Sequence, residues 1–175
     1  ALSKLQKNLS LNPDLGKRII PINTFVSSQT ENNPVIKAFS SWKVDGSNST
    51  KEFHPIHCGY AESTAGVASI TLNDFCSQNN IQKIDFIKID TDGHEYAVLK
   101  GAKDDISKFH PKIVFEVGMY MMKEQEISFS FYTTYFNELN YVLMNSKTGK
   151  KITIQNYMNL IPQKGTIDIL AIPMN

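Results

Sequence analysis

The stretch KIDFIKIDTDGHEYAVLKGAKDDISKFHPKIVFEV, Lys83–Val117, decides the fold of this chain. It contains two apolar runs, FIKI and KIVF, which are centred on β-branched residues and are typical of parallel strands covered on both faces. A helical pattern that begins at about Gly93 separates them. The sequence therefore predicts an α/β fold, with strands at Lys83–Asp90 and Pro111–Val117.

The alternation of strands and helices continues towards the C-terminus. Aromatic residues at a spacing of three and four predict a helix with a buried stripe at Phe129–Leu139. Three further apolar segments predict strands at Tyr141–Asn145, at Lys151–Gln155 and at Thr166–Pro173.

The first part of the chain is less regular. Leu2, Leu5 and Leu9 form the stripe of an amphipathic helix that ends at Asn12–Pro13, and a strand is expected at Arg18–Val26. Residues 27–69 form a polar excursion, in which Asp45–Gly46 predicts one hairpin. A short helix is expected near Leu72.

Composition limits the classes of protein to which the chain can belong. With 175 residues there is room for one domain, so residues 1–175 are expected to form a single α/β domain. Eighteen Lys+Arg against seventeen Asp+Glu give a net charge of +1, which provides no overall field for nucleic acid or an anionic membrane. Two cysteines suit a reducing compartment, so we expect a cytoplasmic protein, and no apolar run approaches the ~20 residues of a membrane span.

The residues most able to carry chemistry follow the first strand, in the segment 90–95, DTDGHE. Ligands of open α/β sheets bind beyond the carboxyl ends of the strands, which here are marked by Asp90, Thr91, Asp92, Glu116 and Gly118. Asp92 and Glu95 also fit a capping box, in which both would only stabilise the start of a helix. Asp90 has no role in a cap, and we expect it to bind a ligand or to act in catalysis.

No metal site is predicted. Placing Gly93 at position six of an EF-hand loop puts Lys88 at position one and Leu99 at position twelve, where oxygen ligands are required. A looser divalent site of Asp90, Asp92 and Glu95 stays open as an alternative.

The segment Ile70–Val117 resembles the central part of the FkbM family of S-adenosylmethionine-dependent methyltransferases. The resemblance rests on elements that occur in the family's order. These are Thr71-Leu72-Asn73-Asp74, Ile87-Lys88-Ile89-Asp90, Asp92-Gly93-His94-Glu95, Val98-Leu99-Lys100-Gly101-Ala102 and the strand Pro111–Glu116.

The resemblance implies a class I, Rossmann-like methyltransferase sheet that is mostly parallel, with a reversed C-terminal strand. It implies transfer of a methyl group from S-adenosyl-L-methionine to an oxygen or nitrogen atom of a sugar or other small metabolite. Asp90, His94 and Glu95 become the candidate catalytic residues. Ser27, Ser28, Asp90 and Thr91 become the candidate residues for binding the cofactor.

The chain departs from the family in its glycines. The closest pair among the nine, Gly59 and Gly66, is seven residues apart, so the glycine-rich turn that cradles the cofactor has no counterpart. We therefore expect an incomplete sheet in a fragment of a larger methyltransferase domain. The alternatives are that a homodimer partner or another chain completes the sheet, or that the remaining strands close up in a new order. The rival function is a non-catalytic α/β module for binding or assembly, suggested by the missing glycine turn and the aromatic stripe.

Overall fold

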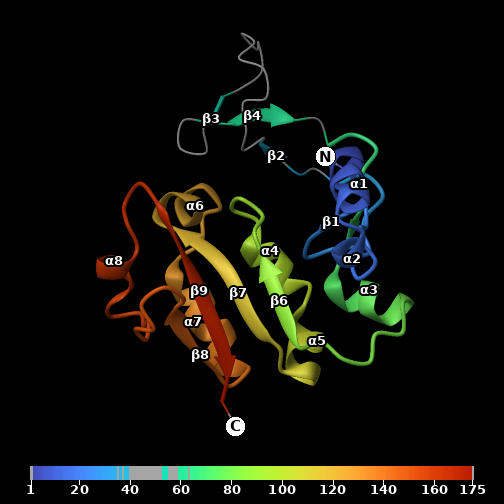
Figure 1. Ribbon diagram of the computed structural model, residues 1–175. Coiled ribbons are helices and arrows are strands. Elements are labelled where there is room, and N and C mark those ends of the chain that lie inside the picture. The colour runs from blue at the N-terminus through green and yellow to red at the C-terminus, as the bar shows by residue number, and fades with distance from the viewer. Residues whose placement is uncertain are drawn as a thin grey trace.

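The computed structural model describes residues 2–34, 36, 38–39, 53–54, 59–62 and 64–174. Its centre is a four-stranded sheet in the order β6-β7-β9-β8 (Figure 1). The pairing of β6 with β7 is parallel, whereas β9 is antiparallel to both β7 and β8. Strands β6, β7 and β8 therefore point the same way and the C-terminal strand is reversed. Their bounds are Phe86–Ile89 for β6, Lys112–Gly118 for β7, Tyr141–Asn145 for β8 and Thr166–Pro173 for β9.

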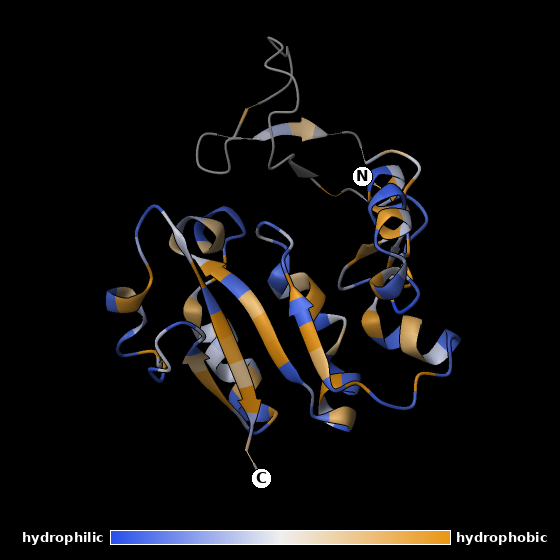
Figure 2. Ribbon diagram, viewed as in Figure 1, coloured by the Kyte–Doolittle hydropathy of each residue, from blue (hydrophilic) through white to orange (hydrophobic). Residues whose placement is uncertain are grey.

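Helices cover one face of this sheet. In Figure 1, α4, α5 and α7 lie behind the strands, and α6 lies beyond the end of β7. Figure 2 shows hydrophobic residues through the middle of β7 and β9 and hydrophilic residues in many of the surrounding loops. The α/β class is thus confirmed, and the sheet is mixed. The helices are α4 at Glu95–Lys100, α5 at Lys103–Phe109, α6 at Met119–Glu124 and α7 at Phe129–Glu138.

Aromatic side chains join the helices to the sheet. The ring of Phe115 on β7 stacks on Tyr132 and Phe136 of α7, with centroid distances of 5.4 and 5.2 Å. The hydroxyl of Tyr135 donates to the carbonyl oxygen of Leu99 at 2.5 Å, so a polar group on the same helix is also satisfied inside the core. The predicted buried stripe of the 129–139 helix is confirmed.

The opposite face of the sheet is only partly covered by the described residues. Along β7 the buried residues alternate with Lys112, Val114 and Glu116, which are exposed or half-buried. On β6, Phe86 is 55% exposed and Lys88 is exposed as well. The expectation that both apolar runs are covered on both faces is therefore wrong for the described part of the chain, where only the helix-bearing face is closed.

The N-terminal part forms a separate small group of elements. Helix α1, Leu2–Leu11, is followed by α2, Pro13–Gly16, and then by β1, Phe25–Val26, which pairs in parallel with β5, Ser69–Ile70. The strand expected at 18–26 is thus reduced to two residues. Pro21 has no N–H for a ladder and Ile20 is 84% exposed, which explains why the first part of this run does not pair.

Residues 27–69 contain a second small sheet. Its strands are β2 at Ala38–Phe39, β4 at Gly59–Glu62 and β3 at Phe53–His54, in the antiparallel order β2-β4-β3. The hairpin predicted at Asp45–Gly46 lies outside the described residues.

The strand predicted at 151–155 does not form. Only one bridge, between Met144 and Lys151, connects this segment to β8. The N–H of Ile152 still donates to the carbonyl of Leu143 at 2.9 Å, but after this residue the segment turns away from β8. The side chain of Asn156 stabilises the turn, because its oxygen accepts from the backbone N–H of Thr153 at 2.8 Å and its amide donates to the carbonyl of Lys151. The chain then continues into the short helix α8, Tyr157–Leu160.

Across the described residues, none of the helices combines the length and the apolar character that a membrane crossing needs.

We expect Phe136→Ala to lower the free energy of unfolding by about 3–5 kcal/mol, because it removes a fully buried ring from the stack on Phe115. Urea denaturation followed by circular dichroism measures this. Phe86→Ala is the matched control, and because that ring is 55% exposed its cost should stay below about 1 kcal/mol. Equal losses in the two variants would contradict the assignment of the core.

Candidate functional site

The carboxyl end of β6 leads into a tight turn before α4. Asp92 and Gly93 adopt left-handed backbone conformations, with φ of 51° and 109°. Glycine tolerates this conformation without steric cost, and aspartate tolerates it better than most residues, so the sequence Asp-Gly suits the turn. The turn brings Asp90, Thr91, His94 and Glu95 to one end of the sheet.

Asp90 lies on the surface of this end. Its side chain is 62% exposed and its Oδ2 is 2.9 Å from the Nζ of Lys88, two residues earlier on the strand. Ion pairs this exposed contribute little to stability. The carboxylate of Asp90 therefore has no evident structural duty and is accessible to a ligand.

Lys88 pairs with two acidic side chains on the helix-free face and lies in the field of a third, Glu116. Its Nζ is also 3.7 Å from Oδ1 of Asp168 on β9. Partial burial would lower the pKa of Lys88, but the hydrogen bond to Asp90 and the charges of Asp90, Asp168 and Glu116 outweigh it and raise that pKa above the ordinary value. Glu116 is oriented in turn by Thr166, whose hydroxyl donates to its Oε1 at 2.5 Å. The result is a charged row across β6, β7 and β9.

Glu95 has a different role from the one that a capping box predicts. It is the first residue of α4 and 1% exposed, the N-cap position is His94, and Asp92 lies earlier, in the left-handed region. Its Oε1 accepts from the backbone N–H and the hydroxyl of Thr91 at 2.8 and 3.0 Å, and its Oε2 accepts from the N–H of Gly93 at 3.0 Å. The capping-box interpretation is wrong, since this carboxylate holds the turn that precedes the helix.

Burial has a second effect on Glu95. Removal from water raises the pKa of this carboxyl group, and the hydrogen bonds from Thr91 offset the shift only in part. The hydroxyl of Thr91 is already used as a donor in this network, so only its oxygen is left to accept from a ligand. His94 is half-buried beside them.

Ser27 and Ser28 lie elsewhere. Both follow β1 and are half-buried, and the N–H of Ser27 donates to the carbonyl of Ile70 at 3.0 Å. The carbonyl oxygen of Ser27 packs against Gly101, at the C-terminal end of α4, whereas Asp90 and Thr91 precede the N-terminal end of that helix. The structure thus groups Asp90, Thr91, His94 and Glu95 but leaves the two serines about one helix length away.

Two members of the charged row were not predicted. Lys88 is two residues from Asp90, so the period of two along a strand was a signal that both lie on one face. Asp168 comes from β9, and only the pairing of Glu116 with Asp168 brings it near. Among the described residues, no group of three His, Cys, Asp or Glu side chains is arranged to hold a metal ion.

A family model, that of the methyltransferase FkbM domain, matches residues 2–143. The match covers most of the 175 residues and includes the whole turn after β6. The chain belongs to the FkbM methyltransferase family. No curated protein and no solved structure matches it significantly.

Two of the FkbM motif elements have structural explanations. Thr71 is the N-cap of α3, Leu72–Gln78, and its hydroxyl oxygen accepts from the N–H of Asp74 at 2.9 Å. At Gly101 a Cβ atom would collide with the backbone of Ser27, so a glycine is needed for this close approach. With Glu95 holding its turn, Asp90 is a motif carboxylate that pairs only with the exposed Lys88 among the described residues and that the packing of the FkbM domain does not account for.

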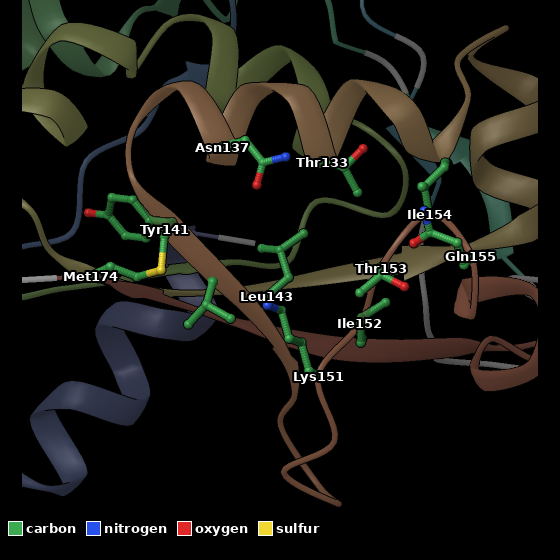
Figure 3. A pocket seen from close by; sticks show the side chains of 11 residues that line it. Thr133, Asn137, Tyr141, Leu143, Lys151, Ile152, Thr153, Ile154, Gln155 and Met174 are labelled. Carbon is green, nitrogen blue, oxygen red and sulfur yellow. The ribbon is translucent and has the colours of Figure 1, made fainter.

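The FkbM domain also has a hollow far from this turn (Figure 3). Its volume is about 310 Å³, and it lies between α7, the start of β8 and the segment 151–155. Since β8 and β6 point the same way, the hollow is near the amino end of the sheet, whereas Asp90 is at the carboxyl end. Figure 3 shows Thr133 and Asn137 reaching down from the helix over Leu143. Lys151 is the charged residue in its lining.

We expect Glu95→Gln to destabilise the protein by about 1–3 kcal/mol at about pH 4, because an amide NH₂ cannot accept from the turn. The raised pKa means that the folded protein keeps this proton to a higher pH than the unfolded chain. The contribution of Glu95 to stability is therefore complete below the unfolded pKa and falls as the pH rises through the folded pKa. The difference between wild type and variant should shrink towards about pH 7.

Urea denaturation across this pH range measures the change. Glu138→Gln is the control for loss of one carboxylate, because Glu138 is an exposed partner of Lys103. A difference for Glu95→Gln that grows with pH would show that the carboxylate is stabilised as the anion.

Proposed function

We propose that the protein to which this FkbM domain belongs transfers a methyl group from S-adenosyl-L-methionine to an oxygen or nitrogen atom of a sugar or other small metabolite. The observation that carries this proposal is the family match over residues 2–143. Accessibility of Asp90 at the carboxyl end of β6 supports it, since ligands of α/β sheets bind at such ends. We place the protein in the cytoplasm on the basis of its cysteine content alone.

The sheet supports a relation to class I methyltransferases. Three strands point one way and the C-terminal strand is reversed, which is the pattern expected for the second half of such a sheet. Strand β6 is at the end of the order, and its outer edge has no partner among the described residues. We propose that further strands complete the sheet along β6, supplied by the same polypeptide or by a complementing chain.

The described residues fit the proposed cofactor only in part. Asp90 and Thr91 offer oxygen acceptors at the strand end, but a cradle of closely spaced glycines is not found anywhere in the sequence. When bound, the cofactor supplies an electrophilic methyl group on a sulfonium ion.

The turn itself can orient an acceptor. Asp90 can accept a hydrogen bond from the hydroxyl or amine group that is to be methylated. The ion pair with Lys88 restrains the position of this carboxylate. Glu95 keeps the turn in place, which makes it a positioning residue more readily than a base, since all three of its hydrogen bonds go to Thr91 and Gly93. His94, beside them at the helix start, remains a candidate base.

Two observations suggested the alternative function, a non-catalytic binding or assembly module. The first still holds, because the sequence lacks the glycine-rich turn, which a module without a cofactor does not need. Most of the aromatic stripe, however, is buried within the domain, with Phe129, Tyr132 and Phe136 at most 3% exposed, and among its rings the half-buried Phe131 is the one left for a partner.

Replacing Asp90 by Asn in the complete protein should lower methyl transfer by about 10²-fold or more, because the amide cannot accept a proton from the substrate. Formation of S-adenosylhomocysteine with a panel of sugar and amine acceptors measures it. Asp85→Asn is the matched control at the other end of β6, since Asp85 is 71% exposed and pairs with Lys83 at 2.7 Å. Unchanged transfer by the Asp90 variant removes this residue from the mechanism.

The 175-residue chain by itself should bind S-adenosylmethionine weakly or not at all, because it lacks a turn that lets backbone approach the ligand. Isothermal titration calorimetry tests this. Micromolar binding with one-to-one stoichiometry would mean that these residues form a cofactor site without a glycine-rich turn.

A further inference from the structure

Glu116 lies beside Asp90 at the carboxyl end of the sheet. Ile89 of β6 is in register with Phe115 of β7, so the residues that follow them, Asp90 and Glu116, are neighbours on strands about 4.8 Å apart. Both side chains belong to the charged row on the helix-free face. Two carboxylates therefore meet at the strand ends, where ligands of α/β sheets bind.

A hydroxyl group on the neighbouring strand holds Glu116 in place. Thr166 of β9 donates from its Oγ1 to Oε1 of Glu116. Thr166 is in register with Gly118, where a Cβ atom would lie 2.9 Å from Cγ2 of Thr166, so the glycine leaves the space that this threonine occupies. A carboxylate restrained in this way loses less conformational freedom when it binds a ligand.

The second oxygen of Glu116 is open to a ligand. Lys88 pairs with Asp90 and Asp168, but its ammonium group forms no ion pair with Glu116 in the described structure. Oε2 of Glu116 accepts no hydrogen bond from the described residues. Within that part of the chain, Asp105 has the one buried side-chain oxygen that lacks a hydrogen bond, so Oε2 of Glu116 keeps contact with solvent.

The ring of Tyr120 borders the same strand end. Its Cε1 is 3.0 Å from the position that a Cβ atom would take at Gly118. Burial raises the pKa of Tyr120 to about 12, and the charges of nearby carboxylates, Glu116 first among them, add to the shift. The phenol is therefore neutral at physiological pH, and it flanks Glu116 without neutralising the carboxylate.

We infer that Glu116 is a second residue of the methyl-acceptor site, that it binds two neighbouring hydroxyl groups of a sugar together with Asp90, and that Thr166 positions it. An ionised carboxylate accepts hydrogen bonds and donates none, so two of them side by side select a ligand with two donors close together. A ligand with one hydroxyl group would leave one carboxylate without a partner. The inference rests on the proposed function.

The test measures methyl transfer by the complete protein to methyl glucoside, galactoside and mannoside, to their deoxy derivatives that each lack one ring hydroxyl, and to simple amines. Glu116→Gln should raise KM for the best glycoside by about tenfold or more, because a hydrogen bond to a charged group is lost. KM for S-adenosylmethionine should not change. The deoxy derivative that lacks the hydroxyl bound by Glu116 should have about the same KM with wild type and with Glu116→Gln.

Further variants separate contact from charge and from position. Glu124→Gln is the matched control, because it makes the same exchange at an exposed residue of α6 whose charge also reaches Tyr120, and it should leave KM for the glycoside unchanged. Thr166→Val should raise that KM by about threefold or more, and Thr166→Ser, which keeps the hydroxyl, should restore it. If circular dichroism shows that Glu116→Gln does not fold, the two Thr166 variants decide.

The outcomes distinguish this inference from the proposed function. Absence of transfer by wild type to every acceptor, amines included, would refute the proposed function and this inference with it. Transfer by wild type with an unchanged KM in Glu116→Gln, or deoxy derivatives that all match their parent glycoside, would refute this inference alone. A preference for simple amines over every glycoside would overturn the assignment of two hydroxyl groups.

Discussion

The packing of α7 on β7 is the contact on which the rest of the domain depends. Phe115 lies between Tyr132 and Phe136, and the same helix reaches the end of α4 through the hydroxyl of Tyr135. This layer fixes the height of α4 above the sheet. The turn before α4 can then be closed by a buried carboxylate, because Glu95 is held where its oxygens meet the N–H groups of Thr91 and Gly93.

Three residues of the family motif support the fold. Thr71 begins a helix, Gly101 permits a close backbone contact and Glu95 orders a turn, all of which are satisfied within the chain. Asp90 differs because its partners are a surface lysine and solvent. This exposure makes Asp90 a candidate for contact with a substrate, so the proposed orientation of the acceptor rests on this aspartate, whereas the proposed methyl transfer rests on the family match.

Much of the second half of the domain could be predicted from sequence. Strands β7, β8 and β9 and helix α7 have strong apolar patterns and form close to their predicted bounds, whereas β6 covers only Phe86–Ile89 of the predicted Lys83–Asp90. Two strands were over-predicted for local reasons. Asn156 stabilises a turn that leads the 151–155 segment away from β8, and Pro21 lacks a donor in the 18–26 run. The charged row was only partly predictable, since no local pattern shows that Asp168 lies opposite Glu116.

The edge of β6, which has no partner among the described residues, has a consequence for how such a site evolves. Lys88 lies on this border strand and Asp90 follows its last residue, so a polypeptide that docked there as we propose would set the tilt of the strand and thereby the direction of the carboxylate. Turnover would then respond to substitutions in a segment that never touches a substrate. Compensatory substitutions should therefore accumulate along this interface. Exchanging the docking segment between relatives would change the rate of the enzyme without any change in the residues of its pocket.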